Sequence, residues 1–105
     1  METDFIIVET TYANLDEAKK LAEILLKKKL AACIHFLPIE SLYLWQGDAK
    51  NASEILVRIK ARNTSFWQIK KIIKNHHEYK IPQIIAISIN QGSKSYLDWL
   101  DTTVV

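Results

Sequence analysis

The stretch Leu30–Gly47 constrains the fold of this 105-residue chain more than any other segment. It has the composition of an extended segment that is apolar on both faces, and it exceeds the five or six residues that are typical of a strand. Pro38 cannot donate a hydrogen bond to a ladder, so we expect it at a sheet edge or at an irregularity such as a bulge. A long apolar edge strand promotes aggregation unless another surface covers it. The sequence therefore predicts a chain that assembles with copies of itself.

Length and composition narrow the class of protein. A chain of 105 residues suits a single domain over residues 1–105. The net charge of +2 is too small to favour nucleic acid as a partner. Cys33 is the only cysteine, which excludes an internal disulfide and a cysteine-only zinc site. No apolar run approaches the roughly 20 residues of a membrane helix, and no signal peptide is visible, so we expect a cytoplasmic protein without membrane insertion.

Hydrophobic periodicity predicts the first strand and helix. The apolar run Phe5–Val8 suits a buried strand, with Thr10–Asn14 as its exit loop. Asn14 is a good N-cap, and Glu17 three residues later completes a capping box. Apolar residues then recur at helical spacing from Leu15 to Leu26. The pattern predicts a helix that buries one stripe and ends in a solvated lysine run.

The remaining pattern completes an alternation of strands and helices. In chain order it predicts a hairpin loop over 46–51, a strand over 54–62, a helix capped by Asn63 or Thr64 that ends near His76, a strand over 84–89 and a short helix capped by Ser93. The order β-α-β-β-α-β with a C-terminal helix is the α+β, ferredoxin-like split βαβ arrangement. Right-handed crossovers place the first and third strands in the centre and the two apolar strands at the edges. Closed symmetric assembly would cover those edges.

This topology hosts unrelated functions, so the residues must decide between them. The third strand has no aromatic residue on which a base could stack, which argues against RNA recognition. The segment Thr10–Asn14 contains no cysteine, which excludes the Cys-x-x-Cys loop of copper-carrying domains, and no arginine for acyl-phosphate hydrolysis. Two glycines cannot build a glycine-rich phosphate loop, and no nucleophile–base pair is evident. We therefore expect a protein that is not an enzyme.

Several residues remain as candidates for binding. His76 and His77 offer two imidazoles, which either bind a metal ion or stabilise the negative end of a helix. Cys33 is expected to be a buried structural thiol. Lys60 is either a solvated charge or an anion ligand in a cleft between subunits, together with Glu9, Tyr43, Trp45 and Tyr79.

Five motifs follow one another along the chain: Leu30-Ala-Ala-Cys33-Ile, Ser41–Gly47, Ile59-Lys60, His77–Ile84 and Tyr96–Trp99. In this order they resemble the CutA family of divalent-cation tolerance proteins, from Phe5 to about Asp101. The resemblance implies a homotrimer of ferredoxin-like subunits, similar to the PII signalling proteins, in which the long hairpin reaches a neighbour. It also implies a non-enzymatic role in tolerance to copper and other divalent cations.

The resemblance further implies a metal site formed by Glu9, His76 and His77, with Glu9 in place of the family's cysteine. Carboxylate and imidazole ligands favour copper(II), zinc or nickel over copper(I). Two alternatives stay open. One is a PII-like module that binds a small anion through Trp45, Lys60 and Tyr79, and the other is a structural trimer that anchors a partner protein.

Overall fold

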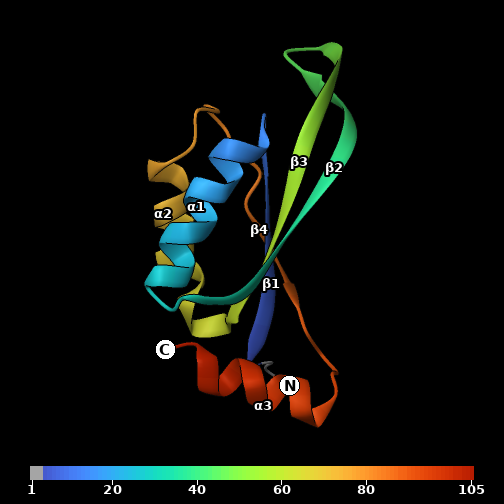
Figure 1. The fold of residues 1–105 in the computed structure, drawn as a ribbon. Coiled ribbons are helices and arrows are strands. Elements are labelled where there is room, and N and C mark those ends of the chain that lie inside the picture. The colour runs from blue at the N-terminus through green and yellow to red at the C-terminus, as the bar shows by residue number, and fades with distance from the viewer. Residues whose placement is uncertain (1–3) are drawn as a thin grey trace.

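The computed structural model describes residues 4–105 as a four-stranded antiparallel sheet in the order β2-β3-β1-β4 (Figure 1). The strands are β1 (Phe5–Tyr12), β2 (Ala31–Trp45), β3 (Asp48–Arg62) and β4 (Ile85–Ser88), and the helices are α1 (Leu15–Lys27), α2 (Phe66–Asn75) and α3 (Lys94–Thr103). Helices α1 and α2 cover one face of the sheet, whereas α3 lies across one end (Figure 1). The predicted α+β, ferredoxin-like topology is confirmed, and β2 and β4 are its edge strands.

The core lies between the sheet and helices α1 and α2. Val57, Ile59 and Ala61 alternate along β3 with their side chains fully buried, as the predicted strand pattern requires. The helices contribute fully buried side chains that face them: Leu21, Leu25, Ile69 and Ile73. This apolar layer fixes which face of every strand points toward the helices and which face is left for other contacts.

Strand β1 is longer than predicted. It continues through Thr10 and Thr11 to Tyr12, where Ile55 of β3 is its partner, so the predicted exit loop from Thr10 is wrong. Thr10 and Tyr12 are fully buried. Threonine and tyrosine favour strands because their side chains pack well on a pleated surface, and here that packing outweighs their polarity.

The helix caps agree with the sequence in two cases out of three. The Asn14 side chain accepts a 2.9 Å hydrogen bond from the Glu17 amide, and Ser93 caps α3 through the Tyr96 amide at 3.4 Å. Helix α2 instead begins through a 3₁₀ turn, Asn63–Ser65, with no side-chain cap hydrogen bond. The predicted cap at Asn63 or Thr64 is therefore wrong, because Asn63 lies within that turn and its amide donates to the Asp4 carbonyl at 2.8 Å.

Strands β2 and β3 form a hairpin that extends well beyond the helices (Figure 1). Pairing continues to Trp45 and Asp48, so the turn is only Gln46-Gly47 and the predicted loop over 46–51 is too long. Their φ angles of 51° and 84° fit a type I′ turn, which matches strand twist. The register shift lies between Ala31 and Cys33 rather than at Pro38, whose place on an edge strand is as predicted.

The hairpin elongates the molecule, whose principal extents are 44 × 28 × 22 Å. In the part of the chain that the structure describes, no helix is both long enough and apolar enough to cross a bilayer.

Candidate functional site

A cleft of about 640 Å³ opens between the β2–β3 hairpin and the segment 79–83 that precedes β4. Tyr43 and Trp45 of β2 line it from one side, and Tyr79 and Lys80 line it from the other. Pockets of roughly 300–1,000 Å³ with aromatic walls and a few polar groups are typical of small-molecule sites. The structure thus brings together two of the residues predicted to bind a ligand, Trp45 and Tyr79.

Tyr79 connects the two walls of the cleft. Its hydroxyl donates a 2.9 Å hydrogen bond to Glu54 Oε2 on β3. Burial, followed by this bond and the charge of Glu54, raises the pKa of Tyr79 to about 12. The tyrosine therefore stays a neutral donor throughout the physiological range, and it ties the segment before β4 to the hairpin.

Lys60 lies elsewhere in the chain. Its Nζ atom donates to the Tyr96 hydroxyl at 3.0 Å and lies 4.9 Å from the centre of the same ring, so it contacts α3. Lys60 pairs with Ile7 and Cys33, whereas the cleft is lined by the distal parts of β2 and β3. Within one chain the structure does not bring Lys60 together with Trp45 and Tyr79. Among residues 4–105, the charged side chains that line the cleft are Lys80, Glu40 and Glu54.

Glu9 is held by an ion pair on the face of the sheet that points away from α1 and α2. Its Oε2 atom lies 3.0 Å from Arg58 Nε, on the residue directly opposite in β3. The Arg58 Nε–H makes no hydrogen bond to that oxygen, so the contact is electrostatic rather than a directed hydrogen bond. Glu9 thus has a cationic partner already.

His77 joins α2 to the end of β1. Its Nε2 atom is 2.6 Å from the Thr11 carbonyl, and its Nδ1 accepts from the Tyr79 amide at 3.1 Å. These partners assign the proton to Nε2, because a carbonyl only accepts. The ring also stacks on Tyr12, with centroids 4.2 Å apart. Both nitrogens are therefore engaged in holding the fold.

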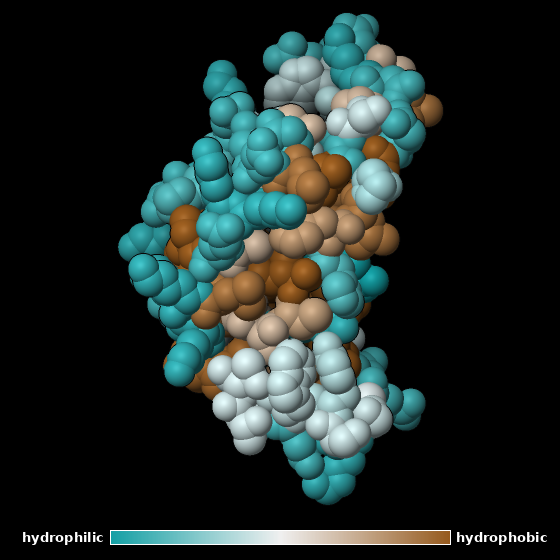
Figure 2. Space-filling view, in the orientation of Figure 1, coloured by the Kyte–Doolittle hydropathy of each residue, from teal (hydrophilic) through white to brown (hydrophobic). Residues whose placement is uncertain are grey.

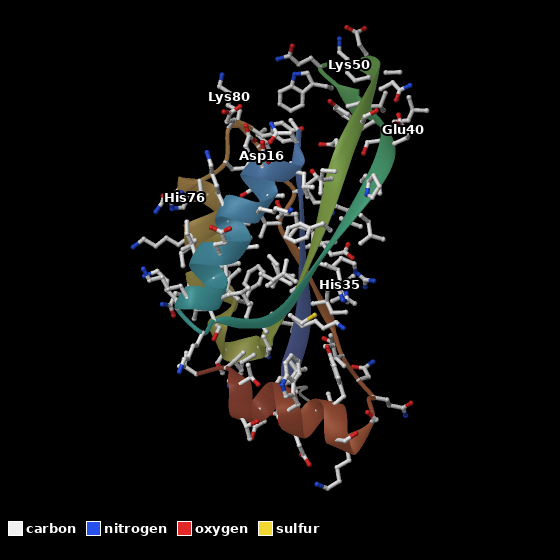
Figure 3. All side chains as sticks on the ribbon, in the orientation of Figure 1. Asp16, His35, Glu40, Lys50, His76 and Lys80 are labelled. Atoms are coloured by element: carbon white, nitrogen blue, oxygen red, sulfur yellow. The ribbon has the colours of Figure 1, made fainter. Side chains whose placement is uncertain are left out.

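The side chain of His76 has a different environment from that of His77. It is exposed at the C-cap of α2, and Figure 3 shows its side chain on the outer side of that helix. Its backbone carbonyl accepts from the Tyr12 hydroxyl at 3.5 Å. Among residues 4–105, no three His, Cys, Asp or Glu side chains lie close enough to hold one metal ion. The structure therefore does not gather Glu9, His76 and His77 into a metal site within a single chain.

One contact that the sequence analysis did not single out involves β2. The Cys33 Sγ atom lies 3.5 Å from His35 Nε2. The spacing Cys-x-His within an expected strand is the signal that could have found it, because residues two apart share a face.

Comparison with known proteins identifies the family. The sequence profile of the CutA1 divalent ion tolerance proteins matches residues 6–103. A divalent-cation tolerance protein CutA from Archaeoglobus fulgidus is 42% identical over 94 residues, which cover 90% of this chain and 92% of that protein. The chloroplastic protein CutA of Arabidopsis thaliana is 41% identical over 90% of this chain, which spans 53% of the plant protein.

The fold comparison agrees. The structure of the A. fulgidus protein, described there as periplasmic, superposes with a TM-score of 0.93 at 39% identity, covering 96% of this chain and 99% of that one. The relatives are thus assigned to different compartments, and a cytoplasmic location stays a prediction from the sequence. By sequence and by fold, this chain belongs to the family of CutA1 divalent ion tolerance proteins.

Proposed function

We propose that this protein acts as a non-enzymatic homotrimer in tolerance to divalent cations, with the β2–β3 hairpin of each subunit packed on a neighbour. One observation carries this proposal: Leu42 and Leu44, on the protruding part of β2, are each 78% exposed in the single chain. Burying a leucine side chain contributes about 1.5–3 kcal/mol. A surface that leaves such side chains in water is typical of a subunit interface.

The opposite edge of the sheet supports the same assembly. On β4, Ile85 and Ile87 are 46% and 42% exposed. Figure 2 shows further apolar surface between α1 and the hairpin. Closed cyclic symmetry would let the edge of one subunit meet the hairpin of the next, in the manner of the PII-like trimer that the motifs imply. The names of the relatives, which are divalent-cation tolerance proteins, support the cellular role.

Sedimentation of the wild type and of Leu44→Glu tests the assembly. The charge should not be tolerated in a packed apolar interface, so we expect a trimer for the wild type and monomers or aggregates for the variant. Leu26→Glu is the control, because Leu26 is also exposed, at 45%, but lies on α1. A trimer that persists in Leu44→Glu would rule out the hairpin as the interface.

The predicted metal ligands Glu9, His76 and His77 call for separate variants, because their contacts differ. Copper(II) and zinc(II) titrations of the wild type, His76→Ala and His77→Ala would separate their roles. A metal site at the helix end predicts that His76→Ala loses binding without loss of stability. His77→Ala should lower stability in any case, because its two ring contacts disappear. Binding that both variants retain would exclude the helix end as a metal site.

The cleft supports a second candidate function, a PII-like module that binds a small anionic ligand. Its aromatic walls and Lys80 are the observation that favours it. The two carboxylates that also line the cleft, Glu40 and Glu54, already accept hydrogen bonds from Ser53 and Tyr79. A ligand that binds the native state raises the melting temperature. A thermal-shift screen of organic anions against wild type and Lys80→Ala would support this function if the variant lost the shift. The structural-anchor alternative predicts no shift with any small molecule.

A further inference from the structure

Cys33 and His35 place a thiol and an imidazole side by side on β2. Ile34 and Phe36 pack against the core under the helices, so the alternating residues Cys33 and His35 lie on the opposite face of the sheet. Figure 3 shows the sulfur atom next to the labelled His35, on the far side of the molecule from His76. The Sγ and Nε2 atoms are 3.5 Å apart.

That separation matches the spacing of two ligands in a tetrahedral metal site. With metal–sulfur and metal–nitrogen bonds of about 2.3 Å and about 2.0–2.1 Å, and an angle of about 109° between them, sulfur and nitrogen lie about 3.5–3.6 Å apart. The side chains would therefore need little rearrangement to bind one ion together. We propose that the Cys33 thiolate and His35 Nε2 chelate a zinc(II)-like ion.

The donor set determines which metals fit. Thiolate and imidazole ligands suit zinc, copper and cobalt, whereas magnesium and calcium prefer oxygen ligands. In the single chain His35 is exposed and Cys33 is partly exposed, so no other group of the same subunit covers the two atoms. On binding, the thiol releases its proton to solvent and the two remaining tetrahedral positions are filled by water.

Two cations lie across the strand from the pair, and both have other partners. Arg58 is opposite His35 and is paired with the Glu9 carboxylate at 3.0 Å. Lys60 is opposite Cys33 and donates to the Tyr96 hydroxyl. The positive charges therefore point toward their own partners, and the Cys33 thiolate would add a negative charge on this face.

This site deepens the proposed role in cation tolerance but uses none of the helix-end ligands Glu9, His76 and His77. Both ligand atoms belong to one chain, so the pair is formed within each subunit. The competing explanation for the 3.5 Å contact is a hydrogen bond between the thiol and the imidazole. That bond alone would give no metal affinity.

Titration of the reduced full-length protein with cobalt(II) tests the proposal, because a cobalt–thiolate bond produces a charge-transfer absorption band. We expect the band to appear with one cobalt per chain, to be bleached by zinc(II) and to be unaffected by magnesium. Cys33→Ser should abolish the band. His35→Ala should weaken cobalt binding by at least about tenfold, since even outer ligands cost about 10–100-fold.

The variants separate this site from the helix end. His76→Ala is the matched control, an exposed histidine whose loss should leave the cobalt band unchanged. Should Cys33→Ser fail to fold by circular dichroism, His35→Ala still decides, because that side chain is exposed. The absence of a cobalt–thiolate band, or equal affinity in His35→Ala and wild type, would overturn the proposal. If His76→Ala loses zinc binding at the helix end but keeps the cobalt band, the two sites are separate, which supports the proposal.

Discussion

The two halves of the β2–β3 ribbon contrast sharply although they share the same strands. In the half near the helices, Val57 and Ile59 are fully buried, whereas in the protruding half Leu42 and Leu44 are each 78% exposed. The ladder is continuous from one half to the other. Backbone pairing is therefore the same in both halves, and only the source of apolar burial differs. The comparison shows that two strands can pair fully through their backbones in a region where the apolar core of the same chain does not bury their side chains.

The protruding half has few stabilising contacts within the chain. Beyond the ladder, they include the Gln46-Gly47 turn, the Ser53–Glu40 hydrogen bond at 2.6 Å and the Tyr79–Glu54 hydrogen bond at 2.9 Å. An isolated two-stranded hairpin is marginally stable in water. We infer that the helix-covered half is stabilised by its own subunit and the protruding half by a neighbour.

The largest effect should follow a cavity in the helix-covered half. Leu21→Ala removes a fully buried side chain from α1 and should lower the free energy of unfolding by about 2–5 kcal/mol. Leu26→Ala on the same helix, where the leucine is 45% exposed, should change it by no more than about 0.5 kcal/mol. Chemical denaturation would measure both. Equal losses would mean that the helix stripe does not define the core.

A smaller effect should follow a change in the hairpin turn. Gly47 has a φ of 84° and open space around its Cα, so Gly47→Ala introduces backbone strain without a clash. The cost should be about 1–2 kcal/mol, measured by thermal unfolding. Gln46→Gly relieves the other positive φ, at 51°, and should be neutral or stabilising. A neutral Gly47→Ala would show that the turn is not type I′.

The smallest effect should appear only at high pH. The pKa of Tyr79 is raised to about 12 in the folded state, so the unfolded chain loses this proton first as the pH passes about 10. Stability should then fall between pH 10 and 12, and Tyr79→Phe should reduce that fall. Burial also raises the pKa of Tyr12 to about 12, so Tyr12 should add to the same fall. Denaturation midpoints of the wild type and of Tyr79→Phe at pH 9 and 11 would test this. An equal drop in midpoint between the two pH values in both proteins would contradict it.

The sequence predicted the topology because each element carries its own period or cap. The alternation in Ile55–Ala61 and the Asn14 cap are local signals, and both are confirmed. The predictions that failed concern segments stabilised by tertiary contacts. Thr10–Tyr12 looked like a loop because threonine is polar, and 48–51 looked like a loop because exposed strand residues are polar. In both segments the partner strand continues the pairing.

The candidate site could be predicted only in part. Trp45 and Tyr79 line one cleft, but Lys60 is too far along β3 to join them in one chain. His77 was recognised as a candidate ligand, yet its role in binding the Thr11 carbonyl depends on a contact between segments 66 residues apart. Sequence spacing contains no information about such a contact. Cys33 and His35, by contrast, are close because of strand geometry alone.

Hydrogen exchange of backbone amides in the wild type and in Leu44→Glu tests most directly whether a neighbour stabilises the protruding half. We expect protection in both halves of the wild type. In Leu44→Glu, amides near Leu42 and Asn51 should exchange fast, whereas those near Val8 and Ile59 should stay protected. Protection of the distal hairpin that is the same in both proteins would contradict this account, because it would show that one chain stabilises the hairpin by itself.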